Sequence, residues 1–385
     1  AGGGCCASPR QCSPQGPAVG GALALRASTG GCASPVKLRP HPLGVDGGRR
    51  LRYSGGMDLD ELIGARLAVG FPGREATPDI IEGLRRIRAQ SLVVFSRNFE
   101  TPDQFRRLLR RLQDSLGYPL WVMVDHEGGR TVRFSSGVTQ FPDALTVGNT
   151  QPPEAVARQG TVEAGELRRL GVSVNLAPCV DVLVEGSDPV IGERSYGSDP
   201  DRVARLAVER IRGLQSHGVA ACAKHFPGLG AVPRDPHSTL PSITLNWQEI
   251  EEVHLPPFEA AIRAGVAMVM SSHVCYPGLG EPAQMPATLS RHLTHDLLRT
   301  RMAFQGLMLT DDLEMGALRT LGTIGEVAVR ATEAGHDMLL ICSDLRAAGE
   351  ACDALRRGYE EGRLDRDELE ASVTRITQAM AAFPP

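Results

Sequence analysis

Eight short apolar runs alternate with amphipathic segments after Leu59, and this alternation constrains the fold more than any other feature of the chain. Each run is too short for a helix and is rich in Val, Leu and Met, as fully buried parallel strands are. The segments between the runs place apolar residues three and four positions apart, which is the pattern of a helix with one buried face. The runs span residues 66–71, 92–95, 120–124, 172–176, 219–223, 266–270, 307–309 and 338–341.

This order predicts an α/β chain that folds as a single-domain (β/α)8 TIM barrel, because alternating strands and helices favour a parallel sheet that closes on itself. The helices are expected near 80–87, 105–112, 154–169, 200–216, 247–264, 290–302, 323–335, 345–358 and 366–382. In such a barrel the reactive groups lie at the carboxyl ends of the strands. The residues that follow the apolar runs are therefore the first candidates for a functional site.

Residues 1–56 differ from the rest of the chain. They hold 13 glycines, six prolines and four of the nine cysteines, and they show neither helical nor strand periodicity. Such a segment buries too little apolar surface to offset the entropy lost on ordering it. We therefore expect 1–56 to be a disordered or non-native N-terminal extension and 57–385 to form the barrel. A transit or export signal is the alternative, although the apolar patch at 18–25 is short and interrupted by glycine.

The composition argues against several classes of function. A net charge of −4 gives no electrostatic support for binding nucleic acid. No apolar run approaches the roughly 20 residues that span a bilayer, and a cytoplasmic location is expected. The nine cysteines show no zinc-type spacing and no Cys-x-x-Cys. We therefore expect no disulfide framework and no structural metal.

Charged side chains gather where two of the apolar runs end. Lys224 and His225 follow one run, and the Gly/Pro-rich loop after them carries Asp235 and His237. Asp311 ends another run. A carboxylate on one strand end and an Asp-x-His on a neighbouring loop suit a nucleophile and a proton donor. Strand ends with a purely structural role would rarely gather so many charged groups.

The segments around these residues resemble bacterial β-N-acetylhexosaminidases of glycoside hydrolase family 3. The resemblance runs in the family's order from about residue 60 to residue 380. The matching segments are Asp-His-Glu-Gly-Gly-Arg at 125–130, Asn-Leu-Ala-Pro at 175–178 with Asp181, Glu-Arg-Ser-Tyr-Gly at 193–197, Lys-His-Phe-Pro-Gly at 224–228 with the later Asp-x-His, and Thr-Asp-Asp-Leu-Glu-Met at 310–315.

The resemblance implies a retaining exo-β-N-acetylglucosaminidase that needs no cofactor. Asp311 would be the nucleophile, and His237, oriented by Asp235, would be the general acid/base. The residues implied to bind the N-acetylglucosamine unit are Asp125, Arg133, Arg194, Lys224 and His225. Retaining hydrolysis needs a carboxylate on one face of the sugar and a proton shuttle on the other, and histidine can shuttle protons near neutral pH. The implied substrates are cell-wall peptidoglycan fragments with a terminal N-acetylglucosamine.

Some groups at these strand ends are expected to have structural roles. Successive strand residues point to opposite faces, so only one of Asp311 and Asp312 need enter the pocket. Glu127 is expected to brace the Gly-Gly turn that follows it rather than to take part in chemistry. His273, after a pair of serines, is also expected to be structural.

One loop departs from the family pattern. Where the family has Gly-His-Gly-Asp-Thr, this chain has Gly-Leu-Gly-Ala-Val at 228–232, and Pro233 and Pro236 stiffen the segment. The mobility of this loop and its contacts beyond the first sugar are therefore open questions.

Three alternative functions also remain: a β-glucosidase of the same family, an N-acetylglucosaminide phosphorylase, and a catalytically inactive sugar-binding barrel. The phosphorylase is considered because a histidine does not repel phosphate as a carboxylate would.

Overall fold

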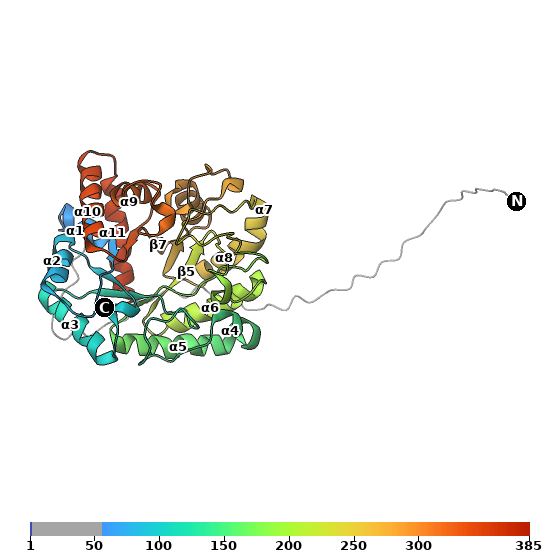
Figure 1. Ribbon diagram of the computed structural model, residues 1–385, viewed down its shortest axis with the longest axis horizontal. Helices are drawn as coiled ribbons and strands as arrows, with labels where there is room; N and C mark the ends of the chain where they lie inside the picture. The colour runs from blue at the N-terminus through green and yellow to red at the C-terminus, as the bar shows by residue number, and fades with distance from the viewer. Residues whose placement is uncertain (2–55) are drawn as a thin grey trace, which may run out of the picture. The chain divides into compact units, whose positions relative to one another are not determined.

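The computed structural model describes Ala1 and residues 56–385, so the extension expected at 1–56 lies, apart from its two end residues, outside the described part of the chain. Eight parallel strands close into a barrel in chain order, with β8 paired to β1 (Figure 1). Helices pack around the outside of this barrel, and α10 and α11 lie next to α1. The prediction of a (β/α)8 barrel is confirmed.

All eight predicted strands are present. Their bounds are β1 (Leu67–Val69), β2 (Ser91–Val94), β3 (Trp121–Val124), β4 (Val174–Asn175), β5 (Ala220–Phe226), β6 (Met268–Ser271), β7 (Leu307–Asp312) and β8 (Met338–Ile341). Two strands run further than their apolar patterns indicate, because backbone pairing continues through charged residues. Lys224 pairs with Met270, and Asp312 pairs with Leu340. Charged groups of the candidate site therefore stand on the last residues of strands.

The predicted helices are also present, and two short ones were missed. The α-helices are α1 (Leu59–Ala65), α2 (Pro78–Ile87), α3 (Pro102–Leu116), α4 (Ala144–Thr150), α5 (Pro153–Leu170), α6 (Pro200–Gln215), α7 (Trp247–Glu249), α8 (Leu255–Arg263), α9 (Ile324–Glu333), α10 (Leu345–Glu360) and α11 (Arg366–Ala382). The segments η3 (Ile250–His254) and η6 (His292–Arg301) are π-helical parts of two predicted helices. The missed helices are α1 and α4. None of the helices among residues 56–385 is both long and apolar enough to cross a membrane.

Alternate residues of the strands fill the barrel interior, as expected for a packed core rather than a pore. Trp121, Met123, Met268 and Leu307 belong to this inner cluster. Helix α11 covers the amino-terminal end of the barrel, where the indole Nε1 of Trp121 donates to the carbonyl of Phe383 at 2.8 Å. With that end closed by packing, the carboxyl ends of the strands are the side on which a ligand can enter.

Candidate active site

A cavity of about 430 Å³ lies at the carboxyl ends of the strands. It is lined by all eight residues predicted to act on or bind a substrate, which are Asp125, Arg133, Arg194, Lys224, His225, Asp235, His237 and Asp311. Other side chains of the lining include Glu127, Arg130 and Asp188. The fold therefore brings together residues that are separated by nearly 190 positions in the sequence.

Lys224 is almost fully buried on β5, and two carboxylates meet its ammonium group. Its Nζ lies 2.6 Å from Asp125 Oδ1 and 2.7 Å from Glu127 Oε1. Burial alone would lower the pKa of Lys224, but the two carboxylates outweigh burial and raise that pKa. Arg133 approaches the other oxygen of Asp125, with Nη2 at 3.6 Å. The cavity wall thus holds the fixed ammonium group of Lys224 beside the carboxylate of Asp125, which Lys224 and Arg133 share.

Glu127 holds a second cation. Nε and Nη2 of Arg194 donate to its two carboxylate oxygens at 2.8 and 2.9 Å, which is a bidentate pair. Burial would raise the pKa of Glu127, but Arg194 and Lys224 lower it well below its usual range. Glu127 was expected to brace the Gly-Gly turn, and its side chain has contacts that this expectation did not include. Its backbone N–H does serve the turn by donating to the carbonyl of Thr131 at 2.8 Å, whereas its side chain bridges two cations.

His225 turns one ring nitrogen toward the protein and the other toward Arg194. Its Nδ1 lies 2.8 Å from Asp181 Oδ2, and this carboxylate can only accept, so the proton resides on Nδ1. Its Nε2 lies 3.4 Å from Nη2 of Arg194. Asp181 is fully buried and also accepts the backbone N–H groups of His225 and of Leu229. The ring therefore presents Nε2 as an acceptor at the cavity.

Asp311 and Asp312 occupy the end of β7 and differ in direction, as strand alternation predicts. Asp311 lines the cavity, and its Oδ1 accepts the backbone N–H of Asp312 at 2.8 Å. Within residues 56–385, no hydrogen-bond donor meets the other oxygen of Asp311. Asp312 is not part of the lining, and its Oδ1 accepts the backbone N–H groups of Glu314 and Cys342, each at 3.1 Å.

The two neighbouring carboxyl groups titrate in opposite directions. Burial would raise the pKa of Asp311, but the nearby rings of His225 and His273, the backbone N–H of Asp312 and the ammonium of Lys224 outweigh burial and lower it. Burial, together with the charges of Glu314 and Asp311, raises the pKa of Asp312 to about 7. As pH rises, Asp311, which faces the cavity, therefore loses its proton before Asp312 does.

Asp235 and His237 form a hydrogen-bonded pair on the loop after β5. Asp235 Oδ1 lies 2.7 Å from the ring Nδ1 of His237 and accepts the backbone N–H of the same residue at 2.8 Å. Partial burial would raise the pKa of Asp235, but these two contacts outweigh it and lower that pKa. The side chain of His237 is 61% exposed, so its ring lies on the solvent side of the cavity.

Backbone contacts hold this loop from two sides. The N–H of Gly316, just after β7, donates to the carbonyl of His237 at 3.1 Å. A Cβ at position 316 would lie 2.5 Å from that carbonyl oxygen, so glycine permits the close approach. On the other side, the N–H of Asp188 donates to the carbonyl of Val232 at 2.7 Å. The loop that carries His237 is therefore tied to the strand end that carries Asp311.

The apolar residues at which the loop departs from the family pattern have a place in the core. Leu229 and Val232 are both buried in the large apolar cluster around the barrel. A polar pair at these positions would be costly to bury without partners. In this chain the base of the loop is thus a packed, apolar element.

Two residues of the site had no predicted role in it. Glu127 stands two residues after Asp125, and residues at that spacing share a face of an extended chain, so the sequence offered a signal. For Asp181 the sequence offered no signal beyond its place in a segment that matches the family, because its partner His225 lies 44 positions away.

The chain is similar in sequence to known proteins. The family model for the glycosyl hydrolase family 3 N terminal domain matches residues 60–379. A beta-hexosaminidase of Nitrosomonas eutropha is 38% identical over 285 residues, which cover 72% of this chain and 80% of that protein. A beta-hexosaminidase of Methylococcus capsulatus is 35% identical over 328 residues, which cover 81% of this chain and 94% of that protein.

Solved structures are similar as well. A glycoside hydrolase family 3 beta-N-acetylglucosaminidase from Paenibacillus sp. FPU-7 superposes with a TM-score of 0.82 at 35% identity over 85% of this chain, which spans 63% of that protein. NagZ from Neisseria gonorrhoeae, solved with N-trifluoroacetyl-D-glucosamine, superposes with a TM-score of 0.68 at 31% identity over 82% of this chain and 96% of that protein.

Proposed function

The chain belongs to glycosyl hydrolase family 3 and is a glycoside hydrolase of the β-hexosaminidase type, and from this premise we propose that it is a retaining exo-β-N-acetylglucosaminidase with residues 57–385 as its catalytic domain. One observation carries the proposal: the carboxylate of Asp311 and the Asp235–His237 pair line the same cavity. A retaining mechanism needs such a carboxylate and such a proton shuttle.

In the first step, Asp311 attacks the anomeric carbon and forms a glycosyl ester. The lowered pKa of Asp311 keeps this carboxylate ionised, and its oxygen without a donor is the one available for attack. His237 gives a proton to the departing oxygen, which requires the doubly protonated ring. The carboxylate of Asp235, 2.7 Å from Nδ1, stabilises that cation.

In the second step, His237 takes a proton from water, and the water attacks the same carbon from the side the leaving group vacated. The ester bond to Asp311 breaks, and the sugar leaves with its original anomeric configuration. The loop that carries His237 is fastened to Gly316 near the end of β7. This attachment supports the joint positioning that both steps need.

In this proposal, the polar and charged side chains along the cavity wall bind the sugar. Lys224 and Arg194 offer fixed cationic donors, Asp125 offers a carboxylate acceptor, and His225 offers Nε2. Arg133 completes the set beside Asp125. Charge-assisted hydrogen bonds of this kind contribute about 1.5–3 kcal/mol each, so a few of them suffice for selective binding of a polar ring.

The proposed natural substrates are peptidoglycan fragments that end in N-acetylglucosamine, processed in the cytoplasm by a monomer during cell-wall recycling. The relatives named beta-hexosaminidase and the NagZ structure with a glucosamine derivative support the terminal N-acetylglucosamine of these substrates.

Turnover of an aryl β-N-acetylglucosaminide, set against the matching aryl β-glucoside, tests the proposal. We expect the N-acetylglucosaminide to be cleaved far faster and NMR to show the β-anomer as the first product. An α-anomer as first product would contradict retention, and faster cleavage of the glucoside would indicate a β-glucosidase. A folded protein with no turnover of either substrate would be a sugar-binding barrel.

A phosphorylase is the second candidate, because cationic Arg130, Arg133 and Arg194 line the cavity and the proton shuttle is a histidine. Both features tolerate an entering phosphate anion. The same assay run with and without phosphate separates the two activities. Formation of N-acetylglucosamine 1-phosphate at a rate above hydrolysis would favour the phosphorylase.

A further inference from the structure

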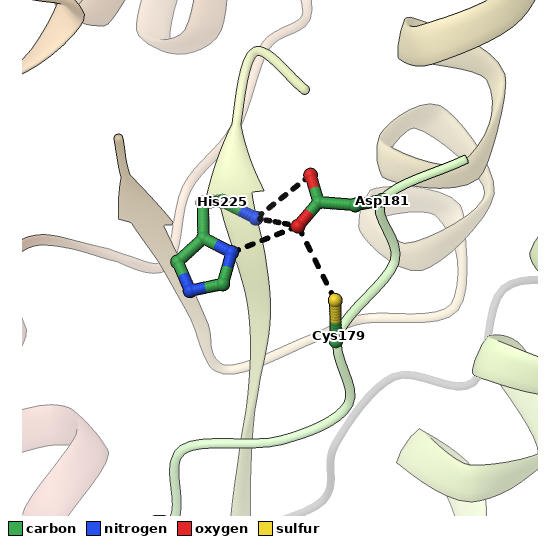
Figure 2. A group of neighbouring side chains, drawn as sticks. All are labelled: Cys179, Asp181 and His225. Carbon is green, nitrogen blue, oxygen red and sulfur yellow. Dashed lines mark hydrogen bonds and ion pairs between the residues drawn. The ribbon is translucent and has the colours of Figure 1, made fainter. Parts of the chain in front are cut away.

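A thiol, a carboxylate and an imidazole meet beside the cavity. Figure 2 shows the side chains of Cys179, Asp181 and His225 pointing toward one another. Sγ of Cys179 lies 3.2 Å and Nδ1 of His225 lies 2.8 Å from the same oxygen, Oδ2 of Asp181. The three donor atoms all lie within 4.8 Å of one another, and all three residues are buried.

The barrel itself creates this cluster. The segment after β4 continues alongside the end of β5, because Cys179 pairs with Lys224 and the N–H of Val180 donates to the Lys224 carbonyl at 2.9 Å. Cys179 and Asp181 are two residues apart in this extended stretch and so share a face. That face meets His225, the residue after Lys224.

We propose that Cys179, Asp181 and His225 form a binding site for a thiophilic divalent cation, Zn²⁺ or Cd²⁺, and that the bound cation inhibits the enzyme through His225. A cysteine sulfur, a histidine nitrogen and a carboxylate oxygen are the ligands that zinc takes in proteins, and three protein ligands leave the fourth position to water. One thiolate and one carboxylate balance the charge of the cation, which suits a buried site. The cation enters from the cavity side, where His225 is part of the lining.

The cation takes the place of two protons. In its absence the S–H of Cys179 and the Nδ1–H of His225 both donate to Asp181. On binding, the thiol proton leaves to solvent, and the cation replaces the proton on Nδ1. The imidazole stays neutral by carrying a proton on Nε2 instead, so one proton is released per cation bound.

This change of tautomer is the cause of the inhibition. Nε2 of His225 is an acceptor at the cavity when Nδ1 is protonated, and it becomes a donor when Nδ1 holds a cation. Nη2 of Arg194, itself a donor, lies 3.4 Å from Nε2. With the cation bound, the N–H groups of His225 Nε2 and Arg194 Nη2 face each other, and both are donors. The cavity also loses Nε2 as an acceptor for the sugar. This consequence rests on the proposed glycosidase function, whereas cation binding does not.

Cys179 can be changed without dismantling the cluster. Asp181 already accepts the backbone N–H groups of His225 and Leu229 and the ring Nδ1–H, and a thiol is a weak donor. Serine at position 179 keeps an O–H donor for Asp181 and removes the thiolate ligand. Cys275, which is buried but lies outside the cluster, is the matched control.

Binding is tested on the full chain with Co²⁺, whose bond to a thiolate absorbs in the near ultraviolet. Wild type, Cys179→Ser, Cys179→Ala and Cys275→Ser are titrated, so that all cysteines other than Cys179 and Cys275 contribute equally to all four. We expect wild type and Cys275→Ser to bind one more Co²⁺ per chain, with thiolate absorption, than the two Cys179 variants. Equal stoichiometry and equal absorption in a folded Cys179 variant would overturn the site.

Inhibition is tested with Zn²⁺ and an aryl β-N-acetylglucosaminide. Without metal, Cys179→Ser is expected to match wild type, and the Zn²⁺ concentration for half inhibition is expected to rise at least about tenfold, the lower bound for loss of a metal-site group. Chelation should restore wild-type turnover. Equal inhibition of both proteins would overturn the role of this cluster. If no protein turns over substrate, the proposed function fails while the Co²⁺ titration still decides the site.

Discussion

Replacing Glu127 with glutamine is expected to weaken the fold and the binding of substrate together, because one carboxylate holds two buried cations. Arg194 would lose a bidentate carboxylate partner at 2.8 and 2.9 Å, while Lys224 would keep Asp125 at 2.6 Å. The glutamine amide has the same shape as the carboxylate, but its NH2 group is a donor and would face an N–H donor of a cation. Removing one partner of a buried ion pair costs about 3–5 kcal/mol. We expect a loss near the lower end, since the amide oxygen still accepts one hydrogen bond.

A loss of this size is measurable by thermal unfolding and by kinetics. At about 2–4 °C per kcal/mol it lowers the melting temperature by roughly 6–12 °C. The KM for an aryl N-acetylglucosaminide should rise as well, because Arg194 loses the bidentate partner that fixes its position. Glu82→Gln is the control: this glutamate is 71% exposed and pairs with Arg85 at 3.0 Å, so its loss should cost less than about 0.5 kcal/mol.

The pH dependence has a defined sign. The pKa of Glu127 is lowered in the folded protein, so its contribution to stability is present above the unfolded value and is lost only as pH falls through the folded one. The difference between wild type and Glu127→Gln should therefore persist from pH 8 down to about pH 4 and shrink only below it. A variant that melts within 1 °C or so of wild type and keeps its KM would refute the role given to Glu127.

Three further variants address the proton chemistry. His237→Ala should slow hydrolysis of natural linkages by about 10²–10⁴-fold yet spare much of the glycosylation step with an activated aryl leaving group; equal slowing of that step for both substrates would show that His237 is not the acid. Asp235→Asn should cause a milder loss and move the basic limb of the pH–rate profile to lower pH, because the carboxylate that stabilises the protonated ring is gone; an unmoved limb would count against the pair. The pKa of Asp312 is raised to about 7, so this acid costs stability increasingly as pH rises from about 4 to 7. Asp312→Asn should therefore gain stability relative to wild type over that range, by roughly 2–4 kcal/mol in urea unfolding, and a difference that does not vary with pH would contradict the raised pKa.

The fold was predictable because buried parallel strands leave a strong trace in sequence. Strands covered on both faces read as continuous apolar runs, and all eight runs became strands. Polar strand ends leave no such trace, so the continuation of β5 and β7 through charged residues was missed. Helix α1 was missed as well, although Asp58 and Glu61 form a capping box that marks its start. Seven residues are too few for a periodic pattern.

The site was predictable in part, because barrel closure brings all strand ends to one side. That rule, with the resemblance to a family, selected eight residues that share one cavity. The pairings within the cavity were not predictable. Glu127 meets Arg194 across 67 positions and Asp181 meets His225 across 44, and no local spacing encodes such contacts. The cluster of Cys179, Asp181 and His225 was missed for the same reason, since His225 comes from a neighbouring strand.

The central claim is that Asp311 is the nucleophile. A fluorinated N-acetylglucosaminyl substrate that slows breakdown of the glycosyl ester should leave the sugar attached to the protein, and peptide mass spectrometry should locate it on Asp311. Asp311→Asn should bind the sugar, form no adduct and show no turnover. A label on Asp312 or Asp125, or full turnover without any covalent adduct, would contradict the account.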